Sequence, residues 1–301
     1  MTVEEKKNRL TDIMAAFIGY TAVHLPDDIV SKLEELRDAE DDPAARSIYD
    51  MMFENMRLAS QLGRPSCQDT GLVQFKIECG SRFPLIHQLK DILHDAVIKA
   101  TAETPLRPNA VEPFDEINTG NNTGTGAPAL FWDIVPDDES CSIYTYLAGG
   151  GCSLPGHAMV LMPGDGYEGV ARFVMDRITS YCLNACPPLL VGVGIAGSIE
   201  TAALLSKHAL LRPAGSHNPN KKAAEMEKLL EDSINAVGIG PQGLGGSSSV
   251  LGVNIEYSAR HTATIGVAVS FGCWTHRRGH ITFDSDLGFI TDTHAGFTYG
   301  L

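Results

Sequence analysis

The feature that most constrains the fold is a change in hydrophobic spacing near Arg64. Before it, apolar residues such as Leu10, Ile13 and Phe17 recur at the spacing of an amphipathic helix. After it, short apolar runs alternate with helical segments. The sequence therefore predicts an α/β fold with a mixed sheet and a helical N-terminal layer.

We expect residues 1–62 to form this helical layer and residues 63–301 to form the α/β region, most simply as one domain, 1–301. Two of the expected strands are separated only by Pro-Asp-Asp-Glu-Ser, which is compatible with a β-hairpin. The expected strands are 73–77, 129–135, 141–147, 188–195, 250–256, 264–271 and 275–283, and the expected helices are 84–101, 167–185, 198–208 and 220–237.

The net charge of -14 argues against nucleic acid or an anionic membrane as a partner, because both would repel the chain. It leaves room for a small anionic substrate, since a few arginines can reverse the field within one pocket. We find no apolar stretch long enough for a membrane span and no signal-peptide pattern at the N-terminus. The expected location is the cytoplasm, where the seven cysteines would be thiols or metal ligands.

Four of the cysteines stand in polar, turn-forming contexts: Cys67, Cys152, Cys186 and Cys273. A cysteine on a turn can direct its sulfur at a metal while nearby amides hydrogen-bond to it. The other three lie inside expected helices or strands, where a small buried apolar side chain is the simpler interpretation. No Cys-x-x-Cys pair occurs, and the residues alone do not select three of the four turn cysteines.

Gly192-Val193-Gly194-Ile195-Ala196-Gly197 matches the glycine pattern of dinucleotide-binding folds. It follows an expected strand and precedes an expected helix, so an NAD-dependent oxidoreductase is a distant alternative. The acidic residue that should follow about 20 positions later is missing. The simpler interpretation is that these glycines let the helix pack closely against the sheet.

Several basic groups could bind carboxylates. Arg107 follows a proline-bounded turn, Arg260 precedes His261, and His276-Arg277-Arg278 lies close to Cys273. Arginine binds a carboxylate through two parallel hydrogen bonds and keeps its charge. A metal with one or two arginines would suit a small hydroxy-dicarboxylate, although a surface ion pair is the commoner role for any single arginine.

Seven motifs occur in order and together resemble the N-terminal half of the class I fumarases. They are Cys-Gln-Asp-Thr-Gly at 67–71, Leu-Arg-Pro-Asn at 106–109, Asn-Thr-Gly-Asn-Asn-Thr at 118–123, Gly-Gly-Gly at 149–151, Cys-Pro-Pro with Val-Gly-Val-Gly at 186–194, Gly-Ile-Gly-Pro-Gln-Gly-Leu-Gly-Gly at 238–246 and Arg-His at 260–261. The resemblance implies a hydro-lyase with that family's N-terminal-domain fold.

Within this family, Ala-Gly-Gly-Gly-Cys at 148–152 is most similar to the α subunits of two-subunit L(+)-tartrate dehydratases, since fumarases usually carry serine after the glycines. Gly-Cys-Trp-Thr-His-Arg-Arg-Gly at 272–279 is similar to them as well. The implied reaction is dehydration of L(+)-tartrate to oxaloacetate. A two-subunit fumarate hydratase acting on fumarate and malate is the alternative.

The resemblance also implies a cofactor and a set of site residues. A 4Fe–4S cluster would be held by three thiolates, with one open iron that binds substrate. Cys152 would be a neighbour and not a ligand. Asp69 would assist proton transfer, Arg107 would bind a substrate carboxylate, and His261 would contact substrate. The ligands would be Cys67, Cys186 and Cys273, and the residues lining the site Gln68, Asp69, Arg107, Gly150 and His261.

Single-chain members of the family carry a C-terminal domain that this sequence lacks. The resemblance therefore implies a separate β subunit, an α2β2 assembly and an active site composed of both chains. The expected partners are this β subunit and a small dicarboxylate, with no nucleic acid and no membrane.

Overall fold

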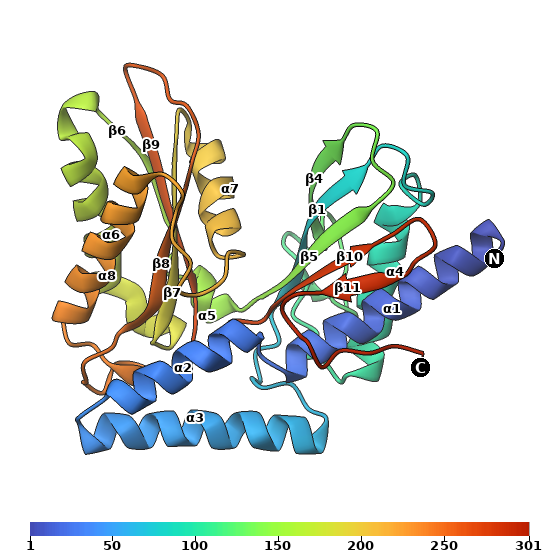
Figure 1. Cartoon of the computed structure of the whole chain (residues 1–301), viewed down its shortest axis with the longest axis horizontal. Helices are drawn as coiled ribbons and strands as arrows, with labels where there is room; N and C mark the ends of the chain where they lie inside the picture. Colours follow the sequence, from blue (N-terminus) through green and yellow to red (C-terminus); the bar gives the residue numbers. More distant parts are fainter. Residues whose placement is uncertain (301) are drawn as a thin grey trace. The chain divides into compact units, whose positions relative to one another are not determined.

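The computed structural model describes residues 1–300, which form two compact units (Figure 1). Unit 1 comprises Met1–Asp27, Asn55–Gly149 and the chain from Arg277 onward, and unit 2 comprises Asp28–Glu54 and Gly150–His276. Each unit contains a mixed sheet covered by helices. The predicted α/β class with N-terminal helices is therefore confirmed, with two mixed sheets among the described residues where one was expected.

The sheet of unit 1 has the order β11-β10-β5-β1-β4. Its centre is β1, which is parallel to β4 and antiparallel to β5. Alternate residues of β1 are buried, among them Val73, Phe75 and Ile77, as expected for a strand with one covered face. The strands are β1 (Leu72–Gly80), β4 (Ala129–Val135), β5 (Cys141–Ala148), β10 (Arg278–Phe283) and β11 (Phe289–Thr291), and a separate ribbon joins β2 (Val111–Glu112) to β3 (Ile117–Asn118).

Helices α1 (Val3–Val23) and α4 (Leu89–Glu103) cover this sheet with their apolar faces. Helix α1 begins at a capping box, in which Thr2 and Glu5 each accept the other's backbone N–H. Phe17 of α1 lies over Gly279 of β10, where any side chain at residue 279 would collide with its ring. This close contact fixes the first helix to the last long strand of the chain.

The sheet of unit 2 has the order β6-β9-β7-β8, with β7 parallel to β8 and antiparallel to β9. All of β7 is buried, because helices cover both of its faces (Figure 1). Helices α6 and α8 pack on one face, and α7 packs on the other. The elements are β6 (His157–Leu161), β7 (Leu189–Ala196), β8 (Val250–Tyr257), β9 (Ile265–Gly272), α6 (Gly166–Tyr181), α7 (Ile199–Ala209) and α8 (Lys221–Ala236).

Short helical turns and two N-terminal helices complete unit 2. The turns are α5 (Gly150–Ser153), η1 (Pro163–Asp165), η2 (Cys182–Ala185) and η3 (Pro241–Gly243). Helix α2 (Asp27–Ala39) is followed by Glu40, whose buried carboxylate accepts hydrogen bonds from Ser247 N at 2.8 Å and Ser247 Oγ at 3.0 Å. Helix α3 (Pro43–Leu62) crosses from unit 2 into unit 1 at Asn55.

The predicted division of the chain at residue 62 does not coincide with these units. Residues 3–62 are indeed helical apart from short connections. However, α1 packs with the sheet of unit 1, whereas α2 and the start of α3 belong to unit 2. The chain changes unit four times, at 27/28, 54/55, 149/150 and 276/277, so each unit is assembled from segments far apart in the sequence.

The hairpin considered for 129–135 and 141–147 does not form. Both strands exist, but β1 lies between them and pairs with each. The long-range pairing with β1 therefore replaces the local turn.

One helical run, Val3–Ala39, has the length and composition of a membrane span. Its apolar window is 67% buried within the structure, as in the core helix of a soluble protein. The run is weak evidence for a span.

Candidate functional site

The residues predicted from the sequence are divided between the two units. Unit 1 contains Cys67, Gln68, Asp69 and Arg107, and unit 2 contains Gly150, Cys186, His261 and Cys273.

In unit 1, a turn fixed at both ends carries Cys67 and Asp69 into β1. Before it, Ser66 N donates to Ala22 O at 3.0 Å. After it, Gly71 N donates to Asp69 Oδ1 at 3.0 Å. Gly71 has φ +77, and a side chain there would lie within 2.9 Å of the Ala148 backbone, so only glycine suits this position. The turn therefore holds the Asp69 carboxylate at the start of the central strand.

A second segment of unit 1 is hydrogen-bonded to this turn. Asn109 Nδ2 donates to Asp69 Oδ1 at 3.3 Å and to Gly71 O at 3.2 Å. Thr70 Oγ1 donates to Arg107 O at 3.2 Å. These bonds hold the backbone of Arg107 next to the turn that carries Asp69, and Cys67 and Gln68 precede Asp69 on the same turn.

Asn122 supports both segments and was not predicted as a site residue. It is buried, adopts φ +63, and accepts from Asn109 N at 2.6 Å through Oδ1. Its Nδ2 donates to Arg107 O at 3.1 Å and to Thr101 Oγ1 at 3.1 Å. The available signal was the density of asparagine at 118–122, because asparagine tolerates the left-handed conformation.

Arg277 also holds this turn. Its buried guanidinium donates to Asp69 O at 2.7 Å through Nη2. The sequence suggested Arg277 as a possible carboxylate ligand near Cys273, and this bond shows that it supports the Asp69 backbone.

In unit 2, Cys186 ends η2 in a left-handed conformation, with φ +53 and ψ 79. For a residue other than glycine this backbone costs about 1 kcal/mol, and such strain is concentrated at functional sites. Gln242 stabilises the following turn, because its N and Nε2 donate to Pro187 O at 2.9 and 3.2 Å. The side chain of Cys186 is exposed.

The turn that carries Cys273 follows β9 and is linked to the Cys186 turn. Trp274 N donates to Cys186 O at 3.3 Å. His276 Nε2 donates to Leu210 O at 2.8 Å, and its ring lies where a side chain on Gly272 would be. The structure therefore brings Cys186 and Cys273 together at the same end of the sheet.

Helix α5 lies at this end as well, in contact with η2 and β9 (Figure 1). Gly151 is so close to Asn184 O that an added Cβ would lie 2.6 Å from it. Gly150 and Cys152 of α5 therefore lie beside the two turns that carry Cys186 and Cys273. We call the group of Cys152, Cys186 and Cys273 the cysteine end of unit 2.

Lys207 of α7 lies near Cys152. Burial lowers the pKa of Lys207, while the nearby Cys152 raises it.

His261 lies at the other end of the same strands. Its loop connects β8 to β9 and packs on Gly197, just after β7. Cys186 precedes β7 and Cys273 follows β9, so the length of eight-residue strands, roughly 25 Å, separates them from His261. Within unit 2, the structure does not bring His261 to the predicted cluster ligands.

Several hydrogen bonds nevertheless hold the His261 loop. Arg260 Nη1 donates to the carbonyl oxygens of His261, Thr262 and Thr264 at 3.1, 3.4 and 3.3 Å. Ala263 N donates to His261 Nδ1 at 3.1 Å, so the proton of the neutral ring lies on Nε2. His261 can therefore donate a hydrogen bond from Nε2.

The glycines of the nucleotide-like motif have a packing role. Side chains added at Gly192 and Gly194 would collide with the backbone of α7, at Ser206 O and Ala202 O respectively. These contacts support the interpretation that the glycines allow close packing of the helix against β7.

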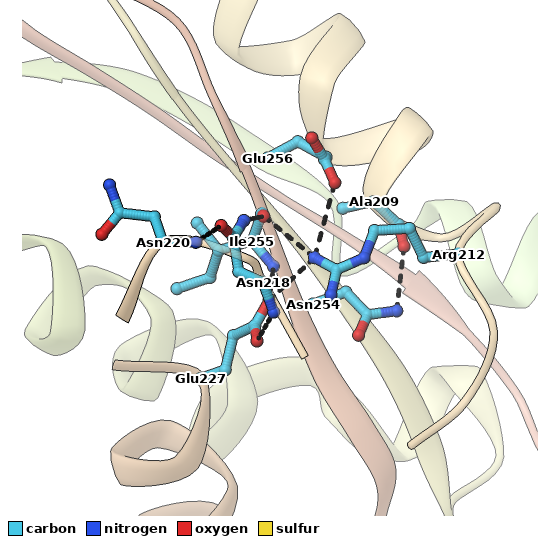
Figure 2. A network of polar contacts seen from close by, with 8 residues as sticks. All are labelled: Ala209, Arg212, Asn218, Asn220, Glu227, Asn254, Ile255 and Glu256. Atoms are coloured by element: carbon cyan, nitrogen blue, oxygen red, sulfur yellow. Dashed lines mark hydrogen bonds and ion pairs between the residues drawn. The ribbon is translucent and has the colours of Figure 1, made fainter. Parts of the chain in front are cut away.

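A second buried polar centre in unit 2 surrounds Glu227 (Figure 2). The carboxylate of Glu227 accepts hydrogen bonds from Arg212 Nη1, Asn218 N and Ile255 N, each at 2.8 Å. Arg212 Nη1 also donates to Ile255 O at 3.1 Å and lies 3.4 Å from Glu256 Oε1. This Glu227 network joins the loop after α7 to α8 and β8, so we interpret it as structural.

A cavity of about 790 Å³ opens between α6 and α8. Its lining is mainly apolar and includes Tyr167, Met226, Tyr257 and Arg260. No cysteine lines it, so it is distinct from the cysteine end of unit 2.

Among residues 1–300, no group of three or more His, Cys, Asp or Glu side chains is arranged to hold a metal ion. Ligands of a cluster bind different irons and are spread more widely than the ligands of one ion. Cys186 and Cys273 fit the arrangement of cluster ligands, since the Trp274 N–Cys186 O bond joins their turns and a hydroxyl lies beside the Cys273 sulfur.

Comparison with known proteins gives a consistent result. The family described as Fumarate hydratase (Fumerase) matches residues 11–282. The L(+)-tartrate dehydratase subunit alpha of Escherichia coli (strain K12) is 55% identical over 291 residues, which cover 97% of this chain and 96% of the relative. The protein of the same name from Shigella sonnei (strain Ss046) gives the same values.

A more distant relative is the putative L(+)-tartrate dehydratase subunit alpha of Methanocaldococcus jannaschii. It is 35% identical over 284 residues, which cover 93% of this chain and 100% of the relative. The similarity therefore extends over nearly the full length of both chains.

Proposed function

This chain belongs to the fumarate hydratase (Fumerase) family of hydro-lyases, and we propose that it is the α subunit of an enzyme that dehydrates L(+)-tartrate to oxaloacetate. The observation that carries the choice of substrate is the 55% identity to tartrate dehydratase α subunits over 97% of the chain. Dehydration of malate to fumarate is the alternative, because the family's own description is fumarate hydratase.

The proposed cofactor is a 4Fe–4S cluster bound by Cys67, Cys186 and Cys273. Class I fumarases depend on iron–sulfur chemistry, and the linked turns of Cys186 and Cys273 supply two sulfurs from one end of unit 2. When bound, the cluster would supply a Lewis-acidic iron for the departing hydroxyl. Cys152 also lies at this end, and in the proposal it remains a neighbour of the cluster.

In the reaction, tartrate loses a hydroxyl from one carbon and a proton from the next, which gives water and the enol of oxaloacetate. Asp69 is proposed to assist the proton transfer, because Gly71 and Asn109 hold its carboxylate in one orientation. Arg107 is proposed to bind a substrate carboxylate, with its backbone fixed by Thr70 and Asn122. Gln68 and Gly150 are proposed to line the same site.

We propose that the enzyme contains a β subunit, since the relatives matched over nearly their full length are named as α subunits. An α2β2 assembly also accounts for His261. Because His261 lies roughly 25 Å from the cysteine end of its own unit, we propose that it acts in the site of a second α chain. There its Nε2–H would donate a hydrogen bond to substrate. The proposed location is the cytoplasm.

Mixed α2β2 complexes test the exchange of His261. A copy with His261→Ala and a copy with Cys186→Ser are each expected to be inactive alone. If His261 acts on the other chain, a complex with one copy of each variant keeps one of its two sites intact. Random mixing makes about half of the complexes mixed, so it restores about a quarter of the wild-type activity. Differently tagged α chains allow the mixed complex to be isolated. No recovery in that complex would place His261 in the site of its own chain and overturn the exchange.

The substrate is tested by anaerobic co-expression with the β subunit and assay with L(+)-tartrate, D-tartrate and malate. We expect an iron–sulfur absorption band and turnover highest with L(+)-tartrate. The control is Cys182→Ser, which changes a buried cysteine outside the proposed ligand set and should keep the iron–sulfur band. Turnover highest with malate would favour the alternative, and an iron-free active enzyme would overturn the cofactor.

A further inference from the structure

Thr275 lies two residues after Cys273, and their side chains are in direct contact. Cys273 Sγ is 3.0 Å from Thr275 Oγ1, and both side chains are buried, with 9% and 2% of their surfaces exposed. The sequence motif around Cys273 did not single out Thr275.

The direction of this hydrogen bond depends on the state of the sulfur. A thiol could donate or accept, but a cysteine that binds iron is a thiolate and has no proton to donate. The Thr275 hydroxyl must then be the donor. This inference rests on the proposed function, because it takes Cys273 to be a cluster ligand.

We propose that the Thr275 hydroxyl donates a hydrogen bond to the iron-bound sulfur of Cys273 and thereby raises the reduction potential of the cluster. A hydrogen bond withdraws electron density from the ligand sulfur and favours the reduced, more negative cluster. Thr275 is a positioning and tuning residue in this proposal, since it acts on the cluster only through Cys273.

The surrounding turn keeps the hydroxyl in place. On one side, Trp274 N is bonded to Cys186 O at 3.3 Å. On the other, the buried His276 is anchored to Leu210 O at 2.8 Å. With both neighbours fixed and the site closed to water, no solvent molecule can readily replace the threonine donor.

The test uses the anaerobic αβ complex carrying Thr275→Val or Thr275→Ser. Valine matches the shape of threonine but has no donor, whereas serine keeps the hydroxyl. The midpoint potential for one-electron reduction of the cluster is measured by titration with dithionite, followed by electron paramagnetic resonance. We expect a lower potential for the valine variant, with about a three- to tenfold smaller equilibrium constant for reduction, and a value near wild type for serine.

A potential unchanged in Thr275→Val, at equal iron content, would overturn this inference. If valine prevents cluster assembly, Thr275→Ala serves as a smaller variant without a hydroxyl. Wild-type complex that contains no cluster would instead refute the proposed cofactor, so the two failures are distinguishable. Thermal unfolding of the iron-free α chains checks that the variants fold equally well.

Discussion

Two polar centres of unit 2 use their residues in opposite ways. In the Glu227 network, both carboxylate oxygens of this α8 residue accept hydrogen bonds from the chain's own loop after α7 or from β8 (Figure 2). At the cysteine end, Cys186 takes a strained left-handed conformation and leaves its side chain exposed. A buried carboxylate whose hydrogen bonds are all supplied by its own chain is typical of a structural role. A strained turn that exposes a sulfur is typical of a functional site.

The substitution that should separate these centres most clearly is Cys186→Ser. We expect turnover of the αβ complex to fall by about 10³-fold or more, because a proposed cluster ligand is lost. The free energy of unfolding of the iron-free α chain should change by less than about 1 kcal/mol, since the side chain is exposed. Iron content, turnover and urea unfolding measure the two effects, and a fully active variant would contradict the functional assignment.

The opposite result is expected for Glu227→Ala. The change removes the closest acidic partner of the partly buried Arg212 and the acceptor of two backbone amides, which should cost about 3 kcal/mol of unfolding free energy. Turnover per folded complex should stay near wild type. Asp232→Asn, at an exposed ion pair with Lys228 on the same helix, is the control and should cost less than about 0.5 kcal/mol. Equal effects of the two changes would show that the network does not stabilise unit 2.

The same contrast explains which parts of the fold the sequence could predict. Strand β7 was predicted because Leu189–Ala196 is a continuous apolar run between Pro188 and Gly197. Strand β6 was missed, since His157–Leu161 is short, lies at the sheet edge and is half exposed. The hairpin was misjudged because β1, far away in the sequence, takes both strands as neighbours. Local patterns do not report such long-range pairing.

The candidate site was predictable to a similar degree. Cys186 and Cys273 stood in visible turn contexts, and the structure links their turns. The supports of unit 1 were not predictable, because Asn109, Asn122 and Arg277 reach Asp69 and Arg107 only in the folded chain. The position of His261 depends on strand direction, which no sequence motif revealed.

A pH titration extends the comparison to a buried polar residue of unit 1. His294 donates to His24 O at 3.1 Å through Nε2 and contacts Thr293 Oγ1 at 2.9 Å through Nδ1. Burial lowers the pKa of His294 to about 4, although the bond to the His24 carbonyl raises it. Because the folded pKa lies below the unfolded value near 6.5, the neutral ring stabilises the fold fully above about pH 6.5.

This stabilisation should be lost as the pH falls from about 6.5 to 4, by about 3 kcal/mol in total. Urea unfolding of the iron-free α chain across this range measures the loss, and His294→Gln should reduce the slope. His94→Gln, at an exposed histidine of α4, is the control and should leave the slope unchanged. A wild-type slope that persists without His294 would assign the effect to other groups.

The smallest expected effect concerns Asn109, a neutral support of a proposed catalytic group. Asn109→Ala removes the donor to Asp69 Oδ1 and Gly71 O, and a hydrogen bond to a charged group is worth about 1.5–3 kcal/mol, so kcat should fall about tenfold or more. Asn118→Ala is the matched control, because Asn118 Nδ2 holds the same segment through Pro108 O at 2.9 Å without touching Asp69. If both variants lose the same activity, Asn109 acts only by holding the loop. A larger loss of activity in Asn109→Ala would show that a residue whose hydrogen bonds all lie within its own chain can still serve the reaction. The contrast between the Glu227 network and the cysteine end would then hold only for residues remote from the reacting groups.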